Sequence, residues 1–150
     1  MKIICGYQGV GKTTYCKEHE WAYDLDSSGY KKTSNWVKRY INDCLKQFDL
    51  GYSEVCISAH RVVIEEILKR NLQKTIDIIV ASPGENKLTW EHRLRLRYHQ
   101  CKKQYALNAL NDFLQNYEND IKYYHKLENR KDVRIIKVMV KIKTNLGTQI

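Results

Sequence analysis

The stretch from Gly6 to Thr13 contains the residue types that bind phosphate. Its sequence, GYQGVGKT, fits the pattern of a glycine, four further residues and Gly-Lys-Ser/Thr, and it directly follows the apolar residues 3–5. Glycines allow tight backbone turns and leave no Cβ between the chain and a ligand, and the amides that follow then point inward around an anion. The pattern therefore predicts a strand, a phosphate-binding turn and a helix, in this order.

Individual residues of this stretch have different chemical roles in a phosphate-binding site. Lys12 supplies a mobile positive charge for the β- and γ-phosphates of a nucleoside triphosphate, and Thr13 offers its hydroxyl to Mg²⁺. The helix that begins here adds unpaired N–H groups and the positive end of its dipole. The predicted ligands are ATP and Mg²⁺, because a bare strand-to-helix turn, the alternative, has no use for Lys12 and Thr13. The predicted nucleotide-binding residues are Gly6, Gly9, Val10, Gly11, Lys12, Thr13 and Thr14.

Two acidic residues, Asp24 and Asp26, follow the second predicted strand, residues 21–23. Side chains alternate along an extended chain, so both carboxylates lie on the same side. At the carboxyl end of an open parallel sheet, that side can face the phosphate site. The third predicted strand ends Ser58-Ala59-His60 without an acidic residue, so Asp24 is the predicted second ligand of Mg²⁺. The alternative role for both aspartates is turn formation and capping.

This combination of motifs resembles the shikimate-kinase and gluconate-kinase branch of the phosphate-loop kinases, in which an Asp-x-Asp follows the second strand. The resemblance implies that Asp24 helps to hold Mg²⁺ and that Asp26 contacts the acceptor hydroxyl as its base. Polynucleotide kinases of bacteriophages also place an acceptor-facing aspartate here, so the acceptor stays open. The order of segments over most of the chain is similar to that of small phage-type nucleotide kinases, through residues 24–28, residues 58–60 and a basic segment after Pro83.

The basic segment lies where a kinase of this architecture has its lid, at about residues 83–103. On a helix, residues three or four apart share a face, so Arg93 and Arg97 are predicted to reach phosphates together, with bidentate contacts. Arg95 is predicted to face away, toward solvent or an acidic partner. The alternative is a solvated helix with ordinary charges. The predicted catalytic residues are therefore Lys12, Asp24, Asp26, Arg93 and Arg97.

Four further polar residues are candidates for acceptor binding. Ser27, Ser28 and Lys31 follow the paired aspartates. His60 follows the third predicted strand at the carboxyl edge of the sheet, where it can orient an acceptor or cap the next helix.

The elements that must position these residues alternate between strand and helix patterns. Strands are predicted at residues 3–5, 21–23, 54–58, 75–81 and 133–142, and helices at 12–20, 60–71, 104–127 and from the N-cap Ser34 to Gly51. Strands separated by helical segments predict a parallel sheet. The expected fold is one α/β domain over residues 1–150, a three-layer phosphate-loop fold with a five-stranded, mainly parallel sheet, flanking helices and a basic helical lid.

Composition limits the remaining possibilities. The chain has 150 residues, 43% hydrophobic and 29% charged, which suits one globular domain with a full core. No apolar run approaches the ~20 residues that cross a bilayer, so no membrane partner is expected. Five scattered cysteines without a Cys-x-x-Cys pair indicate buried thiols in a reducing compartment, the cytoplasm, and no zinc site.

Three functions are compatible with these patterns. The first is an ATP-dependent kinase that moves the γ-phosphate of ATP to a hydroxyl or phosphate of a nucleoside, a nucleotide or a similar small molecule. The second is a nucleic-acid kinase acting on a 5′-hydroxyl or a modified base in DNA or RNA, because a net charge of +9 favours polyanionic partners. The third is a non-catalytic ATP-binding module that contacts a partner through the basic segment.

Overall fold

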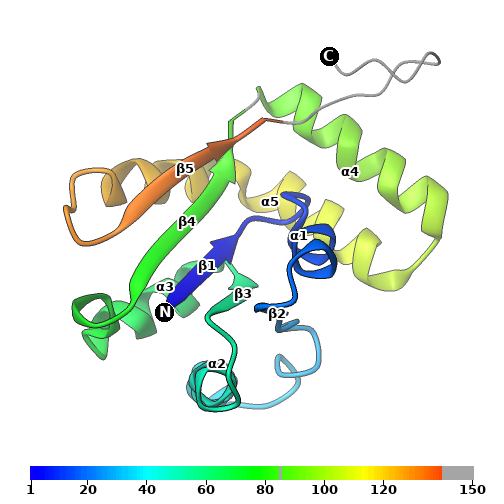
Figure 1. Ribbon diagram of the computed structural model, residues 1–150. Coiled ribbons are helices and arrows are strands. Elements are labelled where there is room, and N and C mark those ends of the chain that lie inside the picture. Colours follow the sequence, from blue (N-terminus) through cyan, green and yellow to red (C-terminus); the bar gives the residue numbers. More distant parts are fainter. Residues whose placement is uncertain (85, 140–150) are drawn as a thin grey trace.

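The computed structural model describes residues 1–84 and 86–139, which form an α/β fold (Figure 1). Five strands make one sheet in the order β2-β3-β1-β4-β5, and every pairing between neighbours is parallel. This confirms the predicted five-stranded parallel sheet. The strands are β1 (Lys2–Gly6), β2 (Ala22–Asp24), β3 (Glu54–Ser58), β4 (Asp77–Pro83) and β5 (Arg134–Val138). The helices are α1 (Lys12–Glu18), α2 (Trp36–Asp49), α3 (Arg61–Lys69), the short 3₁₀ helix η1 (Leu72–Lys74), α4 (Lys87–Cys101) and α5 (Gln104–Leu127).

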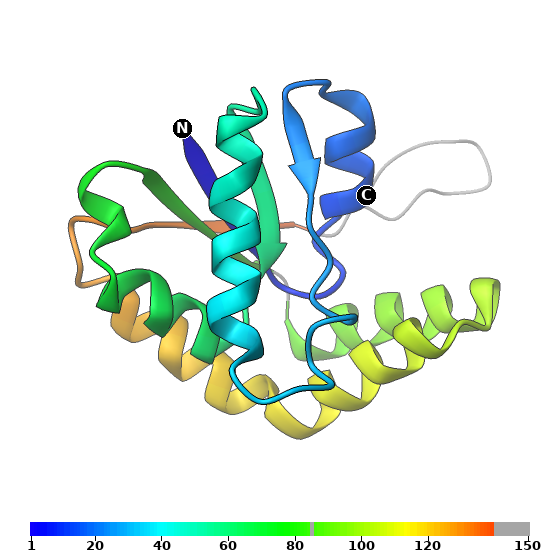
Figure 2. The ribbon, with the colours of Figure 1, turned by 90° about the horizontal axis from the view of Figure 1, so that it is seen from below.

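Helices lie on both faces of the sheet. α3 and α5 lie on one face and α1 on the other, whereas α2 packs against β3 and α3 (Figures 1 and 2). α4 and α5 form a helical hairpin that extends beyond the carboxyl ends of the strands (Figure 2). None of the helices within the described ranges is long and apolar enough to span a bilayer.

The core is built around β1, the central strand. Ile3 pairs with Val55 on β3 and Ile78 on β4, and all three side chains are almost fully buried. One pleat further, Cys5 lies between Ile57 and Val80, which are equally buried. Near-continuous apolar runs of this kind are typical of strands in a parallel sheet that is covered on both faces. The order of strands therefore places the end of β1 at the middle of the sheet.

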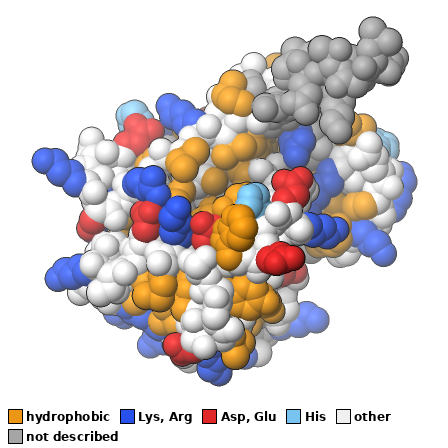
Figure 3. Space-filling view, in the orientation of Figure 1, with side chains coloured by type: hydrophobic (Ala, Val, Ile, Leu, Met, Phe, Trp, Pro, Cys, Tyr) orange, Lys and Arg blue, Asp and Glu red, His pale blue; other side chains and the backbone are white. Residues whose placement is uncertain are grey.

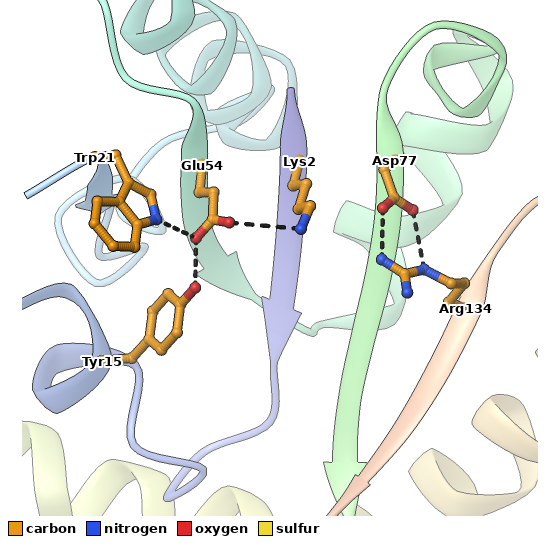
Figure 4. A network of polar contacts seen from close by, with 6 residues as sticks. All are labelled: Lys2, Tyr15, Trp21, Glu54, Asp77 and Arg134. Atoms are coloured by element: carbon orange, nitrogen blue, oxygen red, sulfur yellow. Dashed lines mark hydrogen bonds and ion pairs between the residues drawn. The ribbon is translucent and has the colours of Figure 1, made fainter. Parts of the chain in front are cut away.

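Polar contacts join the strands at their amino ends, opposite the predicted phosphate site (Figure 4). The buried Glu54 accepts hydrogen bonds from Tyr15 Oη and from Trp21 Nε1 (3.2 Å), and its carboxylate lies 3.8 Å from Lys2 Nζ. At the start of β5, Arg134 binds the carboxylate of Asp77 on β4 through both Nε (3.2 Å) and Nη2 (2.5 Å). These contacts hold α1 and the edge strands in register with the centre.

Two predicted boundaries are wrong for identifiable reasons. α2 begins after Asn35, not after Ser34, because Asn35 ends the preceding turn in the left-handed conformation (φ 62°), which asparagine tolerates better than most residues. β4 begins two residues later than predicted, because the amides of Thr75 and Ile76 donate to the carbonyl of Leu72 and close η1 instead of pairing with β1.

Three other segments differ in detail. α1 ends at Glu18, because His19 is already extended (φ −131°). α5 has the predicted bounds. Buried or half-buried residues recur along it at three- and four-residue spacing, at positions 106, 110, 113, 117, 120, 124 and 127, whereas Leu114 lies beside this stripe and is 42% exposed. For the predicted fifth strand, residues 140–142 lie outside the described residues.

Candidate functional site

The predicted glycine-rich turn connects the end of β1 to the start of α1. Gly9 and Gly11 have φ values of 89° and 98°, in the left-handed region that residues with a Cβ rarely adopt. The turn leaves the sheet between the carboxyl ends of β3 and β4. Ligands of open α/β sheets bind at this edge. The predicted order of strand, turn and helix is thus confirmed, and the turn lies where a ligand can reach it.

Lys12, the first residue of α1, lies back across the turn. Its Nζ donates a hydrogen bond to the carbonyl of Gly6 (3.0 Å). Burial lowers the pKa of the Lys12 amine, and the nearby carboxylates of Asp24 and Asp26 oppose this shift. A buried ammonium with such neighbours stabilises an anionic ligand strongly, because little water screens its charge.

Gly6→Ala tests this close approach of Lys12 to the turn. A Cβ at position 6 would lie 2.7 Å from Lys12 Cγ and 2.8 Å from Val10 Cγ2, so the lysine must move. We expect binding of a non-hydrolysable ATP analogue to weaken by about tenfold, or about 1.4 kcal/mol. Titration calorimetry measures this directly. The matched control is Gly29→Ala, where a Cβ meets nothing within 4 Å, and equal affinities for the two variants would contradict the expectation.

Thr13 and Asp24 lie in direct contact beside the turn. Thr13 Oγ1 donates to Asp24 Oδ2 at 2.9 Å. Mg²⁺ in phosphate-transferring proteins takes one or two carboxylates together with substrate phosphates, so this hydroxyl and carboxylate fit the ion. Within residues 1–84 and 86–139, no group of three or more His, Cys, Asp or Glu side chains is arranged to hold a metal. A metal ion at this position would therefore need phosphate oxygens or water as further ligands.

Asp26 makes the turn contacts that were one of its two predicted roles. Its carboxylate closes a local turn, because Ser28 donates to it through both the backbone N (3.2 Å) and Oγ (2.5 Å). The same side chain lines the cleft over the phosphate-binding turn. Ser27 is buried beneath this segment. The local bonds hold the Asp26 carboxylate in place, and its negative charge still acts on Lys12.

A cleft of about 710 Å³ opens between the glycine-rich turn, the segment after β2 and the helical hairpin. It brings together all the site residues predicted from the sequence: Gly6, Gly9, Val10, Gly11, Lys12, Thr13, Thr14, Asp24, Asp26, Ser27, Ser28, His60, Arg93 and Arg97. No protein-family model matches this chain, and a comparison with curated proteins finds no match either. Function is therefore inferred from the geometry and chemistry of this cleft.

The segment predicted as a lid packs directly against the phosphate-binding turn. Trp90 is fully buried and donates from Nε1 to the carbonyl of Gln8 (2.9 Å). Leu94, one helical turn later, is also buried, and Arg93 Nε donates to the carbonyl of Gly9 (2.9 Å). Residues four apart share a helix face, so the pair Trp90 and Leu94 was a readable signal of a packed face that sequence reasoning missed. α4 therefore supports the turn as well as covering the cleft.

Of the three arginines of α4, two line the cleft and one points away, as their spacing predicts. Arg95 points away from the cleft and pairs with Glu91 at 2.9 Å. Arg93 and Arg97 line the cleft, and the Arg97 guanidinium lies 5.0 Å from the centre of the Tyr105 ring. Neither has a carboxylate within 4.0 Å among the described residues, so both can bind an anionic ligand. The arginines that do form ion pairs are Arg61, Arg70, Arg95, Arg130 and Arg134.

Two side chains of the turn bind α5, which sequence reasoning also missed. Gln8 Nε2 donates to Asp112 Oδ2 (2.7 Å), and Tyr7 Oη donates to Asp120 Oδ2 (3.3 Å). The phosphate-binding pattern leaves both positions free, so the sequence contained no signal for these contacts. Burial, and then the charge of Asp112, raise the pKa of Asp120 to about 6. The turn is thus fixed to a titratable carboxyl on α5.

Asp120→Asn should change how stability depends on pH. The folded state holds the Asp120 proton more tightly than the unfolded state, so this group favours folding below about pH 4 and loses that contribution as pH rises through about 6. The variant keeps an acceptor for Tyr7 and removes the ionisation. We expect the free energy of unfolding of the variant to exceed that of the parent by about 1 kcal/mol at pH 7.5, and by less at pH 5. The expected value is modest because the Asp120 carboxyl is only half buried.

Urea unfolding at pH 5 and pH 7.5 measures this difference. Asp49→Asn is the matched control, because Asp49 is an exposed residue at the end of α2. An identical stability change for Asp120→Asn at the two pH values would contradict the role of this carboxyl.

His60 occupies the N-cap position of α3 but makes no side-chain capping bond. Its Nε2 lies 2.6 Å from Lys31 Nζ, and both side chains line the cleft. Burial, and then the charge of Lys31, lower the pKa of His60 to about 4, so its ring is neutral at physiological pH. Of the two roles predicted for His60, capping through the side chain does not occur, and the ring faces the cleft.

Proposed function

We propose that this chain is an ATP- and Mg²⁺-dependent kinase with a phosphate-loop fold. It transfers the γ-phosphate of ATP to a hydroxyl or phosphate of a nucleoside, a nucleotide or a similar small molecule. The observation that supports this best is the 2.9 Å contact between the Thr13 hydroxyl and the Asp24 carboxylate, beside a turn whose amides and Lys12 suit a polyphosphate. Together these groups have the chemistry of a magnesium–triphosphate site.

Phosphoryl transfer depends mostly on positioning and on neutralising charge. The amides of residues 9–12 and the ammonium of Lys12 bind the triphosphate, and Thr13 and Asp24 are the protein ligands of Mg²⁺, which when bound neutralises charge on the phosphate oxygens. Arg93 and Arg97 face the same cleft, and within residues 1–84 and 86–139 they have no carboxylate partner, so they are free to neutralise charge that develops during transfer.

The acceptor side of the cleft suits a molecule with a ring. Asp26 is close enough for its charge to act on the amines of both Lys12 and Lys31, and it is our candidate for orienting the acceptor hydroxyl. Leu96 and Tyr105 line the cleft and are large hydrophobic residues that remain 47% and 50% exposed. An aromatic ring beside an arginine is a favourable surface for a nucleobase. The resemblance to phage-type nucleotide kinases agrees with an acceptor of this class.

Transfer of labelled γ-phosphate from ATP tests the proposal. The purified chain is incubated with Mg²⁺ and a panel of nucleosides, nucleotides and hydroxy acids, and labelled products are separated by chromatography. We expect one class of acceptor to become labelled only when Mg²⁺ is present. Tight binding of ATP without transfer or hydrolysis would contradict the proposal and favour a nucleotide-binding module.

Nucleic acid is a second candidate acceptor, because of the net charge of +9. Basic side chains are interspersed with acidic ones on the face shown in Figure 3, so no single basic field dominates there. Binding of labelled DNA and RNA at increasing salt decides the question, since contacts to several phosphates produce a steep fall in affinity. No measurable binding at low salt would eliminate this candidate.

A further inference from the structure

Ser58, the last residue of β3, lines the cleft and contains an unpaired hydroxyl. The residue is 9% exposed, and its Oγ is buried and has no hydrogen-bond partner among the residues described. Its backbone is held rigidly, because the Ser58 amide donates to Tyr40 Oη (2.9 Å), which in turn donates to the carbonyl of Leu25 (2.6 Å). A buried polar atom without a partner destabilises the folded state by about 1–3 kcal/mol. A bound ligand would supply the missing partner.

Two residues beyond Ser58, the neutral ring of His60 holds the amine of Lys31. The Nζ···Nε2 distance is 2.6 Å, and a neutral imidazole accepts a hydrogen bond from an ammonium at its unprotonated nitrogen. Loss of hydration in the cleft lowers the pKa of Lys31. His60 therefore fixes the position of this cation without neutralising its charge.

The carboxylates around Lys31 are bound to other groups. Asp26 and Asp112 are near enough to act on Lys31 electrostatically, but neither forms an ion pair with it in the described structure. Asp26 accepts its hydrogen bonds from Ser28, and Asp112 accepts from the side chains of Gln8 and Asn116. Among the residues described, the Lys31 cation is therefore left without an ion-pair partner, as Arg93 and Arg97 are in the same cleft.

A third feature favours an anion at the same place. α3 begins directly after His60, so the positive end of its dipole lies three residues beyond Ser58 along the chain. The amides of Val63 and Ile64 donate to the carbonyl of His60, which leaves those of Arg61 and Val62 for a ligand. The cation comes from the loop after β2, and the buried hydroxyl and the helix start come from the segment that joins β3 to α3. None of them belongs to the turn that binds the triphosphate.

We propose that Lys31, Ser58 and the start of α3 form a second oxyanion site, which binds an anionic group of the acceptor, with His60 positioning the lysine. This inference rests on the proposed kinase function and narrows its acceptors to molecules that already contain a phosphate or a carboxylate. Charge-assisted hydrogen bonds from an ammonium and a hydroxyl suit either group. Uncharged nucleosides and sugars are then poor acceptors.

Titration calorimetry on the full chain tests the site, with Mg²⁺ and a non-hydrolysable ATP analogue present. Each of four nucleoside monophosphates is compared with its own nucleoside, and gluconate is compared with glucose. Inorganic phosphate is titrated by itself. We expect an anionic member of one pair to bind at least about tenfold more tightly than its uncharged partner, equivalent to about 1.4 kcal/mol. The pair that shows the preference identifies phosphate or carboxylate as the group recognised. No preference in any pair overturns the inference.

Two variants assign the preference to these residues. Lys31→Gln should reduce the ratio of the affinities for the anionic and the uncharged ligand to about twofold or less. Lys32→Gln, at the exposed neighbouring position, should keep the ratio of the parent. Ser58→Ala should also weaken binding of the anion, but should melt at the same or a higher temperature, because it removes an unsatisfied buried hydroxyl. A lower melting temperature with unchanged binding would mean that Ser58 is structural and would overturn its role.

The ATP analogue separates failure of this inference from failure of the proposed function. Titration of the analogue into the parent protein reports on the phosphate-binding turn alone, and we expect Lys31→Gln to bind it normally. If the parent does not bind the analogue, the kinase proposal fails, whatever the anion preference. If the analogue binds and phosphate is transferred, but the preference survives both Lys31→Gln and Ser58→Ala, only the second site is wrong.

Discussion

Lys12→Ala is expected to abolish phosphate transfer while the chain remains folded. The Lys12 ammonium is the one group of the turn that can move to follow charge on the β- and γ-phosphates, and burial strengthens its interaction with an anion. We expect the rate of transfer to fall by about 10³-fold or more, the size of effect seen when one preorganised charge is removed from a transition state. Labelled-phosphate transfer under saturating ATP measures it.

Folding must be followed in the same variant. In the parent, Lys12 contributes one hydrogen bond to the Gly6 carbonyl, so its loss should change the free energy of unfolding by about 1 kcal/mol. Lys17→Ala, an exposed lysine on the same helix, is the matched control and should keep full activity. Normal consumption of ATP by Lys12→Ala would contradict the assignment of the turn.

Asp24→Asn should lower the transfer rate by about 10²- to 10³-fold and raise the concentration of Mg²⁺ needed for half-maximal activity. The asparagine keeps an oxygen that can accept the hydrogen bond from Thr13, so the local structure is retained and the charge is lost. A neutral amide oxygen is a much weaker ligand for a hard divalent cation than a carboxylate. Transfer rates measured over a series of Mg²⁺ concentrations show both effects.

Asp26→Asn distinguishes the two aspartates. If Asp26 orients the acceptor, this variant should lose rate without a change in the Mg²⁺ requirement, because no contact joins Asp26 to Thr13. Asp49→Asn, far from the cleft on α2, should match the parent.

The same Mg²⁺ dependence in Asp24→Asn as in the parent would contradict the role of Asp24 as a ligand of Mg²⁺.

Much of the framework follows from short-range chemistry. β3 and α5 have the bounds that their apolar patterns predict. The turn at residues 6–13 is readable because glycines with positive φ, a lysine and a threonine occur together at fixed spacing. Arg93 and Arg97 were separated from Arg95 by helix geometry alone, and the structure places them accordingly. Each of these features depends on residues close together in the chain.

Other features depend on contacts between residues far apart in the sequence. The bond from Tyr7 to Asp120 joins residues 113 positions apart, and the bond from Trp90 to Gln8 joins residues 82 apart. A serine at the end of a strand has no distinctive pattern. Ser58 becomes informative only because its hydroxyl is buried without a partner in the described part of the chain. The sequence named Lys31 as a candidate, but its contact with His60 is visible only in the structure.

The sequence by itself determined the glycine-rich turn, the paired aspartates and the alternation of strands and helices, because these depend on local conformation and side-chain chemistry. Tertiary structure alone decided that α4 and α5 support the turn, and that Lys31 and Ser58 lie on one side of the same cleft. The order of strands and the packing of the helical hairpin bring those groups together, and no spacing along the chain encodes such distances. Burial then changes what each group can do, because hydroxyls and charges withdrawn from water need partners.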